Sequence, residues 1–503
     1  MRVIHKDLIK IDQLIVRMKN KMSNEVIYDS IIIGGGVIGC SIARYLSRFK
    51  GSFLVIERHN DVGDETSSAN SAIVHSGYDP KPGTLKARFN VEGNRMMENL
   101  ANELDVPYKK IGSITVALND DDLATLKGLK ERAIINGVDA EFLTKEETIA
   151  IEPNINKNIV GSLYCKDAGI ISPFSLTVSL MENAMDNGVF LKLNTEIVEI
   201  TKVGDIYRVK DQNGNFYNAK TLINATGVNS EVVTKYLEEP SFHITPTKGE
   251  YILLDHFNTQ WVKHTLFMCP SKVGKGVLVS PTTSYNYIVG PSATLTKIGD
   301  TSCDADTYAF LREKAKNLVD GIPYFETIKG FAGVRANNDR EDFIVEESNK
   351  NNNFFLVCGI MSPGLASSPA IGKYVSELIK AKLNLKENKK FNPRIRPHKN
   401  LLEMNLNSYN ALIKQEPDFG HFVCRCEKVS EGEIEDVINR NCGAHTIRGV
   451  RKRTRAGFGK CQGTFCQLEV LKILSKELHV DMKEINYGDI GTNILFSDSK
   501  EVK

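Results

Sequence analysis

The sequence lacks any long uninterrupted apolar stretch. A helix needs about 18 or more consecutive apolar residues to cross a membrane, and no run of that length occurs. The densest apolar stretch, residues 31–39, is broken by the glycines at positions 34–36. We therefore expect a soluble protein without a membrane-spanning helix.

The chain also has little excess charge of either sign. Its 64 Lys and Arg residues against 62 Asp and Glu residues give a formal net charge of +2, which indicates no nucleic acid or other polyelectrolyte as a partner. With 25% charged and 41% hydrophobic residues, the composition excludes a disordered, fibrous or coiled-coil chain. The 503 residues leave room for about three folding units.

Cysteine is scarce and unevenly distributed. Ten cysteines in 503 residues are too few for a disulfide-stapled scaffold, and no signal peptide precedes them. We therefore expect a reducing, cytoplasmic setting. Five cysteines are scattered over the first 400 residues, whereas the other five lie between positions 424 and 466. This clustering indicates a separate cysteine-rich domain.

Residues 1–21 are basic, with six Lys or Arg and two Asp residues, and apolar residues recur at helical spacing from Ile4 to Met18. One interpretation is an amphipathic helix for targeting or for peripheral contact with the inner face of a membrane. The other is an extension without function, upstream of a second start at Met22. We favour the second, because two aspartates and few serines are a poor fit to a transit peptide.

A strand, a glycine turn, a helix and a second strand follow from position 28. β-Branched runs at 29–33 and 53–56 enclose Gly34, Gly36 and Gly39, which form the pattern G-x-G-x-x-G. These glycines allow a tight turn, close approach of a pyrophosphate and close packing of helix on strand. Glu57, at the end of the second strand, can bind a ribose hydroxyl. The pattern predicts a dinucleotide site.

Three later segments indicate which dinucleotide. Residues 221–227 are an apolar strand with a small-residue turn, residues 359–370 are a glycine and serine turn entering a helix, and residues 65–77 are rich in serine and glycine. These segments resemble the D-amino-acid-oxidase-like FAD-dependent oxidoreductases over about residues 28–385, and they occur along the chain in the order expected for that family. That resemblance implies an α/β fold: a Rossmann-like FAD-binding domain interleaved with an α+β substrate domain built on an antiparallel sheet.

The resemblance also implies which residues contact the cofactor. Noncovalent FAD is the simpler expectation, with His75 beside the flavin ring. The expected FAD contacts are Gly34, Gly36, Gly39, Glu57, Arg58, Thr66, Ser67, Ile197, Gly227, Gly364 and Leu365.

A flavin that oxidises an alcohol or amine needs a nearby group for the proton and a cation for an anionic substrate. Arg335 matches the substrate-facing arginine of the family, and its planar fork suits a carboxylate or phosphate. The alternative for Arg335 is a surface ion pair with one of the acids at 339–342. Lys248 and Tyr251 are expected in the same pocket as candidate catalytic residues with His75.

Two groups within the family compete for the substrate assignment. Residues 75–88 and 249–251 resemble the L-2-hydroxyglutarate oxidases. The C-terminal cysteines and Lys248-Gly249 resemble the large subunit of the anaerobic glycerol-3-phosphate dehydrogenases. Tyr251 departs from the second group, since the respiratory glycerophosphate dehydrogenases carry histidine there.

The C-terminal cysteines form two close pairs, Cys424 with Cys426 and Cys461 with Cys466. C-x-C with C-x₄-C resembles the bacterioferritin-associated-ferredoxin-like [2Fe–2S] domain, and structural zinc is the alternative. Six Lys or Arg residues without an acid lie at positions 448–460. We expect them to balance the negative cluster rather than to contact nucleic acid.

We therefore predict an FAD-dependent dehydrogenase with a [2Fe–2S] cluster. It would oxidise a small anionic hydroxylated substrate, with sn-glycerol 3-phosphate first and an L-2-hydroxy acid second, and pass electrons to a protein or a quinone. A flavin-bearing redox or regulatory binding module is the alternative of another class. The expected divisions are 1–24 extension, 25–385 oxidoreductase domain, 386–418 linker, 419–488 small helical [2Fe–2S] domain and 489–503 tail.

Overall fold

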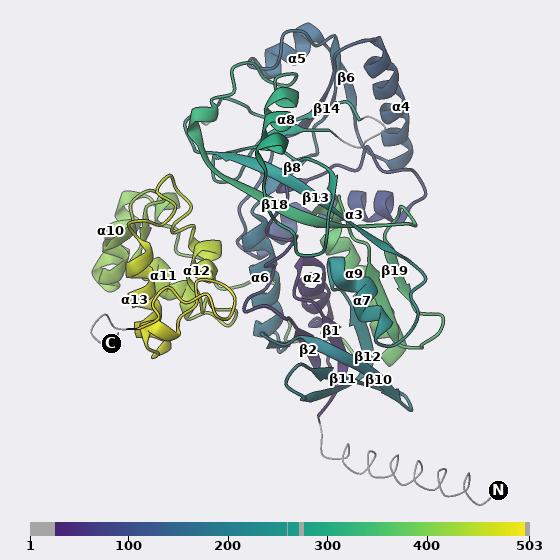
Figure 1. Cartoon of the computed structure of the whole chain (residues 1–503), viewed down its shortest axis with the longest axis vertical. Coiled ribbons are helices and arrows are strands. Elements are labelled where there is room, and N and C mark those ends of the chain that lie inside the picture. Colours follow the sequence, from purple (N-terminus) through teal and green to yellow (C-terminus); the bar gives the residue numbers. More distant parts are fainter. Residues whose placement is uncertain (1–25, 259, 271–275, 498–503) are drawn as a thin grey trace, which may run out of the picture.

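The computed structural model describes residues 26–258, 260–270 and 276–497 (Figure 1). The expectations for residues 1–21 lie outside these ranges. Within them, no helix is long and apolar enough to cross a membrane.

The predicted strand–helix–strand unit is present and lies at the centre of an eight-stranded sheet. β1 (Ile27–Ile33) leads through the glycine turn into α2 (Val37–Leu46), and β2 (Phe53–Ile56) returns parallel to β1. Every residue of β2 is buried, as expected for a strand covered on both faces. The sheet runs β10 (Ile197–Val203), β11 (Ile206–Asp211), β12 (Phe216–Asn224), β1, β2 and β9 (Phe190–Lys192), with β20 (Phe354–Cys358) on β12 and β19 (Ile344–Glu347) on β20.

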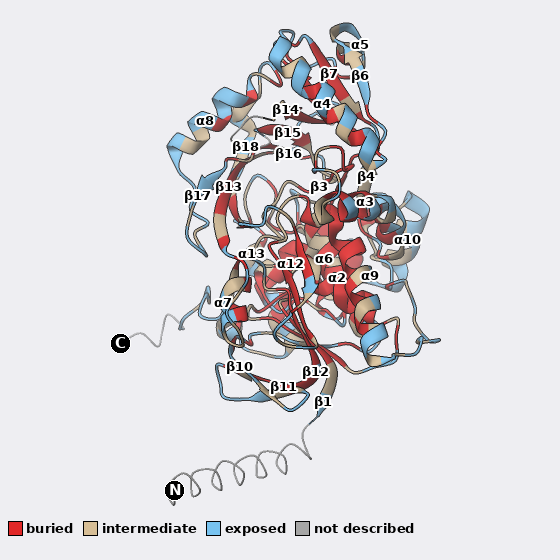
Figure 2. Cartoon of the chain, turned by 90° about the vertical axis from the view of Figure 1, so that its right-hand side faces the viewer, coloured by how far each residue is buried: buried red, intermediate tan, exposed pale blue. Residues whose placement is uncertain are grey.

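Helices from distant parts of the chain cover this sheet. α2 packs against α6 (Pro173–Asp186) and α9 (Gly364–Leu383), and Figure 2 shows these helices as largely buried. Gly372 of α9 permits the close approach, because a side chain there would collide with Ser41 of α2. Ser172 caps α6 by accepting a hydrogen bond from the backbone N–H of Ser175.

A second, mostly antiparallel sheet lies beside the first. In sequence its strands fall between those of the first sheet, at 113–165 and at 244–338. The two units are therefore interleaved, as predicted. Its order is β17 (Thr294–Leu295), β13 (Ile244–Leu254), β16 (Tyr287–Gly290), β15 (Leu278–Pro281), β14 (Thr265–Met268), β5 (Ser113–Ala117), β7 (Gly161–Cys165) and β6 (Glu141–Thr144), with β18 (Thr327–Asn338) on the other edge of β13.

The remaining elements of the main body are a short third sheet and five helices. The third sheet has the order β3 (Ile73–Val74), β8 (Gly169–Ile171) and β4 (Tyr108–Lys110). Three helices contact the second sheet: α4 (Asp120–Asn136), α5 (Lys145–Ile151) and α8 (Ala305–Ala315). The other two lie on the first unit, where α3 (Leu85–Glu103) packs against α9 and α7 (Ser230–Lys235) contacts β12.

The C-terminal part forms a small helical unit at one side of the main body (Figure 1). It contains the hairpin β21 (Phe422–Cys424) and β22 (Val429–Ser430), followed by α11 (Glu431–Ile438), α12 (Ile447–Thr454) and α13 (Gln467–Leu478). Ser430 and Glu433 form a capping box at the start of α11. The segment expected to be a linker also contains a helix, α10 (Leu406–Gln415).

Candidate functional site

A cavity of about 1180 Å³ contacts both sheets. Its walls include the glycine turn after β1, the segment that follows β2, the turn after β12 and the start of α9. The opposite walls come from β13, β14, β15 and β18 of the second sheet. Segments separated by more than 300 positions therefore meet around one extended space, as an elongated dinucleotide requires.

The glycine turn is built for close approach of a phosphate. Gly34 has φ +106°, and a side chain there would collide with the carbonyl oxygen of Ala225. A side chain at Gly39 would collide with the carbonyl oxygen of Gly34, so Gly39 sets the packing of α2 on β1. Gly36 caps α2 without a side-chain hydrogen bond, and the Val37 N–H is bound by the Ser67 hydroxyl at 2.9 Å. The other N–H groups at this helix N-terminus favour anions.

Glu57 lies at the end of β2, where the family motif requires a carboxylate. Its Oε2 accepts a hydrogen bond from the Gly35 N–H at 2.6 Å, and its Oε1 accepts one from the His59 N–H at 2.9 Å. Burial raises the pKa of Glu57, whereas these two bonds oppose the rise. The side chain is thus held rigidly at the cavity wall, with lone pairs left for a ribose hydroxyl.

The cavity brings together nearly all of the residues expected to contact FAD. Gly39 is the exception, because it lies behind the turn in the packing of α2. Those that line the cavity are Gly34, Gly36, Glu57, Arg58, Thr66, Ser67, Ile197, Gly227, Gly364 and Leu365. The residues that line the cavity, together with its shape, therefore fit FAD.

The same cavity contains three of the four candidate catalytic residues, His75, Tyr251 and Arg335. The His75 ring stacks on Phe267 with 5.7 Å between ring centroids. The Tyr251 ring stacks on Phe331 at 4.8 Å. Aromatic walls of this kind reduce access of water to the reacting atoms.

Arg335 is half-buried in β18, opposite Thr247 of β13. A side chain at Gly249 would collide with the guanidinium, so this glycine makes room for it. No described residue forms a hydrogen bond or ion pair with the Arg335 guanidinium. Asp339 and Asp342 instead accept backbone N–H groups of His243 at 3.0 Å and Leu85 at 2.8 Å. The alternative of a surface ion pair is therefore not realised among the described residues.

Lys248 differs from its expected position in the pocket. Neighbouring residues of a strand point to opposite faces, and Thr247 lines the cavity whereas Lys248 does not. The Lys248 amine donates to the Ser302 carbonyl at 2.8 Å and lies 3.4 Å from buried Glu250. Burial lowers the pKa of Lys248, but Glu250 and Asp300 outweigh it and raise the pKa. A lysine held protonated in this way is a poor proton acceptor.

Several lining residues were not identified from the sequence. Thr247 could have been found, because strict alternation along β13 places it on the same face as Tyr251. The others come from elements distant in sequence, such as β14 and β17, or lie inside the segments 65–77 and 359–370, where the sequence did not single them out. They include Asn70, Ser71, Phe267, Ser292, Thr294 and Met361.

The four C-terminal cysteines converge in the small domain. The Sγ atoms of Cys426 and Cys461 are 3.6 Å apart, and Cys424 and Cys466 share a hydrogen bond. That bond lowers the pKa of Cys424 to about 6, although burial opposes it. No three His, Cys, Asp or Glu side chains of the described residues gather around one ion position. Four thiols in two close pairs therefore fit one [2Fe–2S] cluster better than a single zinc ion.

Most of the basic residues at 448–460 pair with carboxylates. Arg448, Lys452 and Arg453 form ion pairs with acids of the main body. Lys460 pairs with Glu326 at 3.0 Å and Arg455 with Glu427 at 2.8 Å. Most of this charge is therefore neutralised by carboxylates, which corrects the expectation that it balances the cluster.

Comparison with known proteins agrees with this geometry. Residues 29–378 match the family described as FAD dependent oxidoreductase (DAO), and residues 422–476 match the BFD-like [2Fe-2S] binding domain. A glycerol 3-phosphate dehydrogenase of Caloramator mitchellensis is 44% identical over 481 residues, which cover 94% of this chain and 99% of that protein.

Two further relatives are more distant. The structure of dithionite-reduced L-alpha-glycerophosphate oxidase from Mycoplasma pneumoniae with FAD bound has a TM-score of 0.70 at 30% identity, covering 74% of this chain and 98% of that one. An L-2-hydroxyglutarate dehydrogenase of Escherichia coli is 29% identical over 273 residues, which cover 53% of this chain and 64% of that protein.

The family match spans more than half of the chain and falls on the segments that form the cavity. FAD and a [2Fe–2S] cluster are accordingly the cofactors of this enzyme. The chain belongs to the DAO family of FAD-dependent oxidoreductases and carries a BFD-like [2Fe–2S] domain at its C-terminal end.

Proposed function

We propose that the chain oxidises sn-glycerol 3-phosphate to dihydroxyacetone phosphate and passes the electrons on through its [2Fe–2S] domain. The observation that carries this proposal is Arg335, a half-buried guanidinium at the cavity wall without an acidic partner among the described residues. A planar fork of N–H donors binds a phosphate through two parallel hydrogen bonds. The relative with 44% identity supports the choice of substrate.

The residues around Arg335 have complementary tasks. Arg335 binds the phosphate and thereby orients the secondary alcohol. His75, which is mostly buried and stacked on Phe267, accepts the hydroxyl proton. The Tyr251 ring, which stacks on Phe331, lines the cavity and limits access of water. We assign no proton transfer to Lys248, because its amine binds Ser302 on the other face of β13.

The cofactors supply the redox chemistry. Bound FAD would take up the hydride from the carbon that bears the hydroxyl. A [2Fe–2S] cluster held by Cys424, Cys426, Cys461 and Cys466 would deliver electrons singly to a protein or a quinone. Cys426 is exposed and Cys461 partly exposed, so this side of the domain is the proposed exit.

Anaerobic reduction of the purified holoenzyme tests the substrate. We expect glycerol 3-phosphate to bleach the visible flavin absorption and 2-hydroxyglutarate and amino acids to leave it unchanged. Bleaching by 2-hydroxyglutarate alone would replace the proposed substrate by the L-2-hydroxy acid. If none of a panel of small alcohols and amines bleaches the flavin, a binding module becomes the better interpretation.

A further inference from the structure

The segment at residues 57–65, here called the cofactor loop, lies between the FAD cavity and the C-terminal domain. Most of the loop lines the cavity, including Glu57, Asp64 and Glu65. The N–H of Gly63 donates to the carbonyl oxygen of Gly35 at 2.9 Å, so the loop rests directly on the glycine turn. The loop contains no helix or strand. Its shape must therefore be held by contacts with other segments.

The C-terminal domain supplies such contacts to the loop. Arg453 of α12 holds both carboxylate oxygens of Asp61, at 2.7 and 2.9 Å. Lys452 lies between Asp61 at 2.8 Å and Asp64 at 2.5 Å. All four side chains are at most 6% exposed. Charge-assisted, two-pronged bonds of this kind fix geometry as well as add energy.

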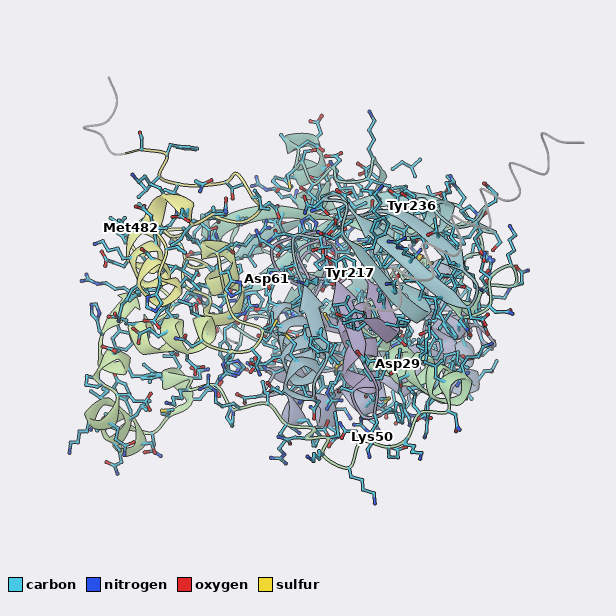
Figure 3. The ribbon with its side chains drawn as sticks, turned by 90° about the horizontal axis from the view of Figure 1, so that it is seen from below. Asp29, Lys50, Asp61, Tyr217, Tyr236 and Met482 are labelled. Carbon is cyan, nitrogen blue, oxygen red and sulfur yellow. The ribbon has the colours of Figure 1, made fainter. Side chains whose placement is uncertain are left out.

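Three further contacts join the loop to the C-terminal domain. The Lys452 amine donates to the carbonyl oxygen of Val62 at 2.9 Å. Asn60 donates to the carbonyl oxygen of Gly488, and His59 lies 3.1 Å from Asp489. Figure 3 labels Asp61 on the side of the main body that faces the C-terminal domain.

We propose that the C-terminal domain positions the cofactor loop for FAD, with Arg453 and Lys452 acting as positioning residues through Asp61 and Asp64. A loop that is already ordered loses less conformational entropy when the cofactor binds. Arg453 does not touch the cofactor. The domain with the iron–sulfur site would therefore raise the affinity for FAD indirectly, by ordering the cofactor loop. By thermodynamic linkage, FAD must stabilise the docked position of the domain by the same factor.

The test compares two buried arginines of the C-terminal domain by FAD titration of flavin-free full-length protein. Arg453→Met removes the contact with Asp61, and we expect the Kd for FAD to rise by about 5- to 150-fold, the usual range for coupled sites. Hydrogen exchange of the backbone N–H groups at 57–65 should accelerate. Iron content should stay as in the wild type, because Arg453 binds no cluster cysteine.

Arg440→Met is the matched control. Arg440 is equally buried and joins the same domain to α6 through Glu182 at 2.9 Å, but it does not contact the cofactor loop. Its loss should leave the Kd and the exchange at 57–65 near the wild-type values. An unchanged Kd in Arg453→Met, or an equal rise in both variants, would overturn the proposal. If Arg453→Met does not fold, Arg448→Met removes the contact with Asp64 at 2.8 Å and has the same expected result.

The reciprocal effect supplies a second measurement. In wild-type protein, FAD should slow proteolysis in the segment 386–418, whereas in Arg453→Met it should slow cleavage much less. Equal protection in both proteins would contradict the coupling. None of these measurements uses a substrate, so their outcome does not depend on the proposed function.

Discussion

Arg335 and Lys248 lie on neighbouring strands and carry the same charge, yet their surroundings give them different tasks. Lys248 is surrounded by Glu250, Asp300 and Ser302 on the outer face of β13. Arg335 faces the cavity, and Gly249 leaves room for its guanidinium. A charge without a partner in a cavity is available for a ligand, whereas a paired charge stabilises the fold.

Replacing Arg335 should therefore weaken substrate capture. We expect Arg335→Ala to lower kcat/KM for glycerol 3-phosphate by about 30- to 1000-fold, or about 2–4 kcal/mol, with FAD still bound. Arg335→Lys should restore part of the loss, because a point charge lacks the planar fork. Rates of anaerobic flavin reduction at subsaturating substrate provide the measurement.

Arg340→Ala is the control for this experiment, since Arg340 pairs with Glu346 near the surface and such pairs contribute little. Lys248→Met should lower the unfolding temperature and leave kcat/KM near the wild-type value. If Arg335→Ala is reduced as fast as the wild type, Arg335 does not bind the substrate.

At the scale of elements, the β1–α2 turn is the clearest case of local sequence dictating structure. The sequence predicted strands at 29–33 and 53–56, and the structure has Ile27–Ile33 and Phe53–Ile56. These strands were predictable because β-branched runs bounded by glycine favour a buried parallel strand. Helix α10 was not predicted, because the basic, proline-bearing stretch before it suggested a linker throughout.

Gly39 tests the packing of α2 on β1. Gly39→Ala should destabilise the protein by about 1–3 kcal/mol through overpacking against Gly34, and reduce flavin retention. Gly128→Ala in α4 should have the opposite sign, because nothing lies within 4 Å of the added carbon and alanine favours helix by about 1 kcal/mol. Thermal unfolding measures the stability of each variant, and the flavin-to-protein ratio measures how much cofactor it retains. A Gly39→Ala protein with wild-type stability would show that the close contact is relieved elsewhere.

On the scale of the whole molecule, the two redox sites lie in separate units with their own cores. We expect Cys461→Ser to lose the cluster, which should otherwise supply about two irons and two acid-labile sulfides per chain. Substrate should still bleach the flavin, because hydride transfer takes place in the other domain. Iron and sulfide analysis with anaerobic bleaching checks both parts, and stoichiometric zinc without sulfide would contradict the cluster assignment.

His59 connects the cofactor loop to Asp489 of the C-terminal part, and its surroundings predict a dependence of stability on pH. Its hydrogen bond with Glu65, opposed by burial and aided by Glu57 and Asp489, raises the pKa to about 9 from 6.5. The folded protein thus binds a proton more tightly than the unfolded chain. This stabilisation is complete below about pH 6.5 and is lost as the pH rises through about 9.

Unfolding midpoints of the flavin-free protein between these pH values provide the measurement. The wild type should lose stability relative to His59→Gln as the pH increases, because glutamine does not titrate. Parallel curves for the two proteins would show that His59 is not protonated in the folded state.

Features that depend on neighbouring residues were determined by the sequence alone. The glycine turn with Glu57, the paired cysteines and the alternation of strands act over short distances in the chain, so pattern and spacing identify them. The residues expected to contact FAD could be named because the family order of these motifs is visible in the sequence.

Only the tertiary structure decided which charges are paired. The partner of Arg453 is Asp61, 392 positions away, and no local pattern connects them. For the same reason the sequence did not reveal that the Arg335 guanidinium has no partner among the described residues, or that Lys248 binds Ser302. Pairing of charges depends on which surfaces the fold brings together, and that is settled by the packing of the two sheets and the docking of the C-terminal domain.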